Sequence, residues 1–212
     1  MLRRRMLVLL SLCLVLLCFG CQGTGKSAGW TATSLRNEDD YFTVPGAQPR
    51  PTIEELEKLF GYELEPMEPI PAYSLAETRR YVPANTDRAS MEVEFYGGKA
   101  VPGFIFDLVE TNGEPDRLNS ISLMFREEYA AKVAEKFLAD AESLWGEPTE
   151  IRTGESVISK NGKQEPTETL MRLWRVDSDE YITLLSAGTI THNGEIITFM
   201  LEWGTYNAAD YQ

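Results

Sequence analysis

The body of this chain lacks cysteine and has almost no histidine. Its three cysteines are Cys13, Cys18 and Cys21, so no disulfide can form within the chain after position 21. The single histidine, His192, precedes a turn signal at 193–194, and we expect it to be a solvent-exposed turn residue. This inventory excludes disulfide scaffolds, His/Cys zinc sites, cysteine nucleophiles and most Ser-His-Asp arrangements. The body must therefore be stabilised by its hydrophobic core.

Positive charge is also scarce. Lys and Arg number 20 against 33 Asp and Glu, which gives a net charge of −13. The first 20 residues contain three arginines and no acid, so their removal would lower the charge by three, to −16. Because so acidic a surface repels phosphate backbones, we predict no nucleic-acid partner. A basic protein or a cationic ligand is electrostatically allowed, although an acidic surface by itself usually serves only solubility.

Motifs that carry catalysis are missing as well. Residues 20–27 match G-x-x-x-x-G-K-S, but a phosphate-binding loop needs a buried strand before it and a helix after it. Here a long apolar run precedes the match and a poor helix start follows it. Acidic neighbours such as Glu127 and Glu128 are typical of a helix start. We therefore predict no enzyme, no cofactor and no metal site, while a carboxylate-based hydrolase remains the open alternative.

The N-terminus carries the clearest signal. Three arginines at 3–5 precede an apolar run over 6–19, interrupted only by Ser11. That run fits the central region of a secretory signal and is shorter than the roughly 20 apolar residues of a spanning helix. It closes at Gly20-Cys21. The stretch resembles a bacterial lipoprotein signal peptide, although Cys18 stands where that family prefers leucine.

The resemblance implies cleavage before Cys21 and attachment of diacylglycerol to its thiol. Cys21 is therefore the predicted lipidation site, and the bilayer is the first predicted partner. The protein would be exported and anchored to a membrane of the cell envelope. Gln22 follows the cysteine, which in Gram-negative bacteria implies the periplasmic side of the outer membrane. The sequence leaves the membrane and leaflet open.

Composition divides the chain into four segments. We predict a signal peptide over 1–20, a lipidated N-terminus and flexible tether over 21–50, a body over 51–205 and a tail over 206–212. The tether is rich in Gly, Ser, Thr and Asn and ends among prolines. It also contains Trp30, Tyr41 and Phe42, which we expect to pack onto the body.

Turn and capping residues define the elements of the body. Thr52 and Glu55 form a capping box before a predicted helix that ends at Gly61. A long amphipathic helix is predicted over 127–145. Strands are predicted where β-formers alternate between turn signals, over 79–82, 90–96, 104–110, 118–125, 149–159, 167–176, 181–191 and 196–203. Asn-Gly turns are predicted at 112–113, 161–162 and 193–194.

This order predicts an α+β fold, with antiparallel β-meanders packed against helices in a two-layer sandwich. Leu59-Phe60-Gly61 and Leu144-Trp145-Gly146 end the two helices alike, so a duplicated unit with halves 51–125 and 126–205 is a further expectation. The layout is similar to that of outer-membrane assembly lipoproteins and tandem-repeat β-lactamase inhibitor proteins.

Aromatic residues gather on neighbouring predicted strands. They are Trp174, Tyr181, Phe199 and Trp203. We expect them to pack on the 127–145 helix, with an open groove as the alternative. Around Met171 and Leu173 both faces of the strand are apolar, which fits either burial on both sides or an exposed patch.

These observations favour a membrane-anchored envelope lipoprotein that is a non-enzymatic binding or assembly module. Its second predicted partner is an envelope protein. An acidic inhibitor-like protein that binds a basic envelope enzyme is the alternative.

Overall fold

The computed structural model describes residues 29–36, 42–48, 50–67, 78–84, 93–107, 117–160, 162–177, 179 and 181–207. The strands are β1 (Leu64–Pro66), β2 (Thr78–Pro83), β3 (Val93–Phe95), β4 (Gly98–Asp107), β5 (Leu118–Arg126), β6 (Glu150–Lys160), β7 (Lys163–Asp177), β8 (Tyr181–His192) and β9 (Glu195–Asn207). The helices are the 3-10 helix η1 (Ala32–Leu35), α2 (Ile53–Phe60), the 3-10 turn η3 (Glu127–Tyr129) and α3 (Ala130–Trp145).

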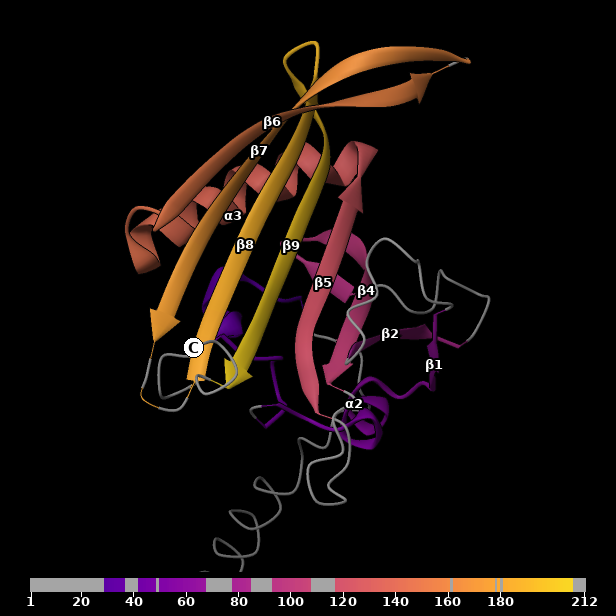
Figure 1. Ribbon diagram of the computed structural model, residues 1–212, viewed down its shortest axis with the longest axis vertical. Coiled ribbons are helices and arrows are strands. Elements are labelled where there is room, and N and C mark those ends of the chain that lie inside the picture. Colours follow the sequence, from indigo (N-terminus) through magenta and orange to yellow (C-terminus); the bar gives the residue numbers. More distant parts are fainter. Residues whose placement is uncertain are drawn as a thin grey trace, which may run out of the picture.

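The described strands form one antiparallel sheet. Its order is β1-β2-β4-β5-β9-β8-β7-β6, and β3 pairs with β4 outside this path (Figure 1). The central pair joins strands far apart in the sequence, because Ile121 of β5 lies opposite Trp203 of β9. The two predicted meanders therefore share one sheet.

The predicted fold class, an α+β two-layer sandwich with a duplicated unit, is wrong. The protein is mainly β, with two α-helices among the described residues. Strands of the halves 51–125 and 126–205 lie in the same sheet, since β5 pairs with β9 across their boundary. The sequence patterns located the strands, but they carry no information about which meander edges pair with each other.

Local sequence signals predicted helix ends and turns more reliably than the order of elements predicted the fold class. The capping box is present, since Thr52 Oγ1 accepts from the Glu55 N–H at 3.3 Å and Glu55 Oε2 accepts from the Thr52 N–H at 2.8 Å. Gly61 ends α2 in the left-handed region at φ 74°. The turn at 193–194 is also confirmed, with φ of 51° and 82°. The predicted turn at 112–113 lies outside the described residues.

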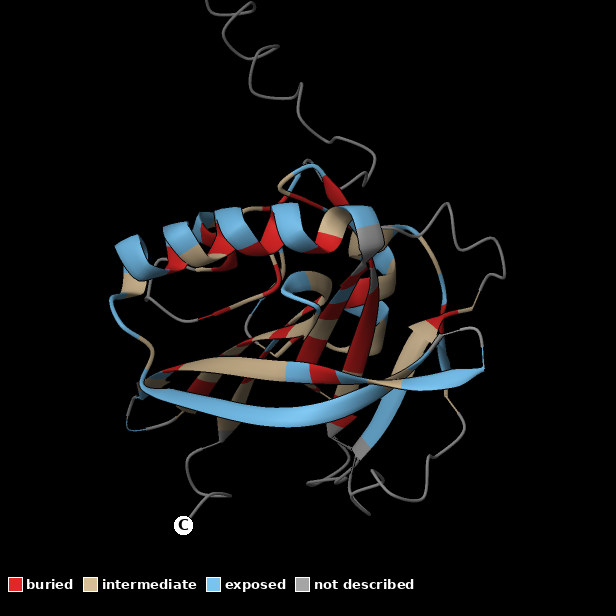
Figure 2. Cartoon of the chain, turned by 90° about the horizontal axis from the view of Figure 1, so that it is seen from above, coloured by how far each residue is buried: buried red, intermediate tan, exposed pale blue. Residues whose placement is uncertain are grey.

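Helix α3 covers one face of the sheet, which we call the inner face (Figure 2). The predicted helix over 127–145 is confirmed except for its first turn, which is the 3-10 turn η3. Its buried residues are Ala130, Val133, Ala134, Phe137 and Ala141. Among the described helices, none has the length and apolar character needed to cross a bilayer.

The predicted packing of the aromatic residues on α3 is confirmed for Trp174 and Phe199. Trp174, Phe199 and Trp203 are buried on the inner face, and the Phe137 ring lies 5.8 Å from that of Phe199 and 6.3 Å from that of Trp174 between centroids. Tyr181 is half-buried. These contacts join α3 to β7 and β9, so the helix is part of the core.

Part of the stretch predicted as a tether lies in this core. Trp30 and Phe42 are 5% and 2% exposed, as expected from their aromatic character. Trp203 Nε1 donates to the carbonyl oxygen of Thr43 at 3.2 Å. Tyr41 lies outside the described residues. At the other end, β9 continues to Asn207, so the first residues of the predicted tail belong to the sheet.

Tyr96 links η1 to α3 and gives a pH-dependent prediction. Its hydroxyl donates to Asp140 Oδ2 and accepts from the Ala32 N–H at 3.0 Å. Burial, followed by the bond to Asp140, raises the pKa of Tyr96 from 10.0 to about 12. A raised phenol pKa contributes stability that is present below pH 10 and is lost as the pH rises through 12.

We therefore expect the melting temperature to fall between pH 10 and 12, and to fall less steeply in Tyr96→Phe. Thermal unfolding followed by circular dichroism across this range measures the slope. Equal slopes in the two proteins would show that the Tyr96 hydroxyl does not contribute.

Candidate functional site: the open face of the sheet

The face of the sheet opposite α3 carries apolar side chains, and we call it the open face. Side chains alternate between the faces of a strand, so residues next to the buried ones point outward. Both described α-helices pack on the inner side, α2 through the ring contact of Phe60 with Phe104. Apolar residues of the open face include Met124, Met171, Leu173, Leu184, Ile190 and Met200. Met124 is 41% exposed and the others are half-buried.

Three methionines form one row across four strands. Met124 of β5 lies opposite Met200 of β9, Met200 lies opposite Gly188 of β8, and Gly188 lies opposite Met171 of β7. Gly188 has no side chain, and the Met200 methyl carbon lies 4.0 Å from where its Cβ would be. Methionine side chains are flexible and polarisable, and they recur on surfaces that bind varied apolar partners. The row is therefore an adaptable apolar surface.

A polar row runs beside the methionine row. Ser122 of β5 and Ser186 of β8 both lie opposite Glu202 of β9. Arg80 reaches this row from β2, and its Nη2 donates to Ser122 Oγ at 3.2 Å. Glycine at position 103 leaves room for this contact between Arg80 and Ser122, because a Cβ there would lie 2.9 Å from Ser122 Oγ.

Glu202 is the acidic centre of the open face. The side chain remains exposed, but the surrounding strands partly desolvate its carboxyl group, and this raises its pKa. The positive charge of Arg80 opposes the shift. An acid next to an apolar row suits a ligand that is apolar and positively charged.

The structure resolves the choice that the sequence left open around Met171. Trp174 lies in the core, whereas Met171 and Leu173 are half-buried on the open face, so the strand is not fully buried on both sides. Sequence reasoning missed Met124 and Met200. Their period-2 alternation with buried neighbours was visible, but their shared row depends on the β5–β9 pairing. The predicted lipidation site, Cys21, lies outside the described residues.

His192 differs from its prediction as an exposed turn residue. Its side chain is only 11% exposed and its Nε2 lies 2.8 Å from Glu165 Oε2. Its Nδ1 lies 3.1 Å from the carbonyl oxygen of Pro166, which can only accept, so Nδ1 carries the hydrogen. His192 therefore ties the end of β8 to β7.

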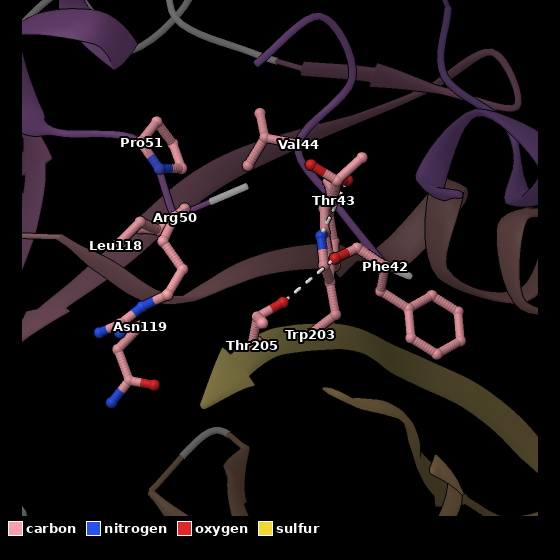
Figure 3. Close-up of a pocket in the computed structure, with 10 residues that line it drawn as sticks. Phe42, Thr43, Val44, Arg50, Pro51, Leu118, Asn119, Trp203 and Thr205 are labelled. Atoms are coloured by element: carbon pink, nitrogen blue, oxygen red, sulfur yellow. Dashed lines mark hydrogen bonds between the residues drawn. The ribbon is translucent and has the colours of Figure 1, made fainter. Parts of the chain in front are cut away.

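A small hollow lies where the N-terminal segment meets β5 and β9 (Figure 3). Thr205 Oγ1 donates to the carbonyl oxygen of Phe42 at 3.4 Å on one wall. The hollow measures about 20 Å³, which suits a single water molecule. Asn119 Oδ1 is buried at its edge and accepts no hydrogen bond from the described residues. We assign the hollow to packing of the N-terminal segment.

The described residues include no cluster of three His, Cys, Asp or Glu side chains placed to hold a metal ion. No protein-family model matches the chain, and no curated protein is similar enough in sequence to be matched.

Proposed function

We propose that this protein is a lipid-anchored binding module of the bacterial cell envelope, and that its open face binds another envelope protein. The partner contributes an apolar segment with positive charge. The observation that carries the proposal is the row of Met124, Met200 and Met171 beside the acidic Glu202. Exposed apolar rows bordered by polar residues are typical of protein interaction sites.

The proposed anchor restricts where the partner can be. Trp30, the first buried residue described, lies nine residues after Cys21 in the sequence. A fully extended chain of that length spans at most about 30 Å. An acylated Cys21 would therefore hold the body close to the bilayer, within reach of membrane proteins and of proteins at the membrane surface.

Replacement of Cys21 by alanine tests the anchor. We expect Cys21→Ala to move the protein from the detergent phase to the aqueous phase, because two or three acyl chains supply the stable membrane attachment. Phase separation in a cloud-point detergent, followed by immunoblotting, measures this. Retention of the variant in the detergent phase would contradict lipidation at Cys21.

Site-specific photo-crosslinking in membranes tests the open face. With a photo-crosslinker in place of Met171, we expect the full-length protein to form one discrete adduct with an envelope protein. Adding Met200→Asp should reduce that adduct at least about tenfold, because a charge in the apolar row costs binding energy. Mass spectrometry of the adduct identifies the partner and the crosslinked segment.

The matched control places the same photo-crosslinker at Leu144, which is 40% exposed on α3. Identical adducts from both positions, or an adduct insensitive to Met200→Asp, would contradict the proposal. Loss of the adduct at high salt would instead favour the acidic, inhibitor-like binder, since charge would then carry the affinity.

A further inference from the structure

Strand β6 is an open edge of the sheet. Among the described residues it pairs only with β7, and it ends the strand order. Figure 1 shows the end of β6 and the start of β7 extending beyond the other strands as a two-stranded arm. An edge strand presents backbone N–H and C=O groups that can pair with another strand. β6 has eleven residues and no proline to prevent such pairing.

The side chains of β6 also favour association. Ile151 and Val157 are each 58% exposed, more than any other large hydrophobic residue described. They are six residues apart and therefore share one face of the strand. The strand contains two acidic and two basic residues, so it is neutral in a chain of net charge −13. One of its cations, Arg152, already binds Glu150 at 2.6 Å.

We infer that β6 pairs antiparallel with β6 of a second copy of this chain, about a two-fold axis at Gly154. In this register Ile151 of each copy lies opposite Val157 of the other. The pairing joins the two sheets into one and covers the exposed apolar residues. It is independent of the open face and of the anchor.

The register follows from symmetry. A two-fold axis perpendicular to the sheet pairs residues of the same face, so the residue numbers in each pair sum to an even value. Moving the two-fold axis from Gly154 to Glu155 would place Glu155 opposite its own copy, and like charges directly opposite each other are destabilising. Moving the axis to Thr153 would place Ile151 opposite Glu155. Of these three registers, only the one centred on Gly154 places Ile151 opposite Val157.

Disulfide crosslinking between two populations tests this register. Full-length chains carrying Ile151→Cys and Val157→Cys, with different tags, are co-expressed, extracted in mild detergent and oxidised. We expect the mixture to form at least about tenfold more disulfide-linked dimer than either variant alone, because only opposite residues come within disulfide range. Identical positions in the two copies are six residues apart along the strands, about 20 Å.

The unsubstituted chain controls for Cys13, Cys18 and Cys21, since the chain after Cys21 contains no cysteine. Equal crosslinking in the mixture and in the single variants, or none in any sample, would overturn the inference. Crosslinks to a different protein in place of the second copy would overturn it as well.

Sedimentation of the detergent-extracted protein supplies a second measurement. Val157→Lys should convert the dimer to a monomer, whereas Leu144→Lys, at an exposed position on α3, should leave it dimeric. A monomeric unsubstituted chain would refute the pairing. The Met171 adduct should be unchanged in Val157→Lys, which separates this inference from the proposed function.

Discussion

Replacing Phe137 with alanine is expected to lower the free energy of unfolding by about 3–5 kcal/mol, the largest effect of any single substitution that we predict. Phe137 is fully buried at the centre of α3. Its ring contacts those of Phe95, Trp145, Trp174 and Phe199. These aromatic neighbours come from different elements, so they cannot all move inward to fill the cavity.

Equilibrium unfolding in urea, followed by tryptophan fluorescence, measures this change. Leu144→Ala is the matched control, because it also shortens an apolar side chain on α3 but at a position that is 40% exposed. We expect the control to lose less than about 1 kcal/mol. A loss in Phe137→Ala no larger than in the control would show that α3 is not essential to the core.

Gly204→Ala is expected to destabilise the protein by about 3 kcal/mol, at the upper end of the usual range for overpacking. A Cβ at position 204 would lie 2.5 Å from the carbonyl oxygen of Asn119 and 2.8 Å from the Cβ of Ser120. The first of these atoms belongs to the backbone of β5, so it cannot rotate away. Relief would require β5 and β9 to separate at the centre of the sheet.

Gly188→Ala is the control for this second substitution. The nearest atom to a Cβ at position 188 is the methyl carbon of Met200, at 4.0 Å, which is an ordinary contact. Alanine is less costly than glycine in a strand, so we expect Gly188→Ala to be neutral or stabilising by up to about 1 kcal/mol. Equal urea midpoints for the two variants would contradict the close approach of β5 and β9.

Gly188 also shows why parts of the candidate site could not be recognised in the sequence. Nothing near Gly188 indicates that it lies between Met171 and Met200, because those neighbours come from β7 and β9. Of the three methionines in the row, only Met171 was identified from the sequence, together with Leu173, as part of a strand with two apolar faces. Arg80 of β2 and Glu202 of β9 are separated by β4 and β5 in the sheet. Their proximity depends on strand pairing, so no local sequence pattern connects them.

The local elements could be predicted from the sequence, because their signals lie within a few residues of each other. Thr52 and Glu55 cap α2, the Asn193-Gly194 pair supplies the positive φ of its turn, and Gly146 ends α3. The positions of most strands followed from alternation and turn residues. The aromatic stripe on β7 to β9 also predicted the face that α3 covers.

The way these elements combine depends on contacts between residues far apart in the chain. It paired β5 with β9, which merged two expected units into one sheet, and it placed Trp30 and Phe42 of the expected tether in the core. It also left the open face uncovered by the described helices and β6 at an edge. The physical reason is that strand pairing depends on backbone groups that all residues share. Its specificity therefore comes from the burial of side chains distant in sequence.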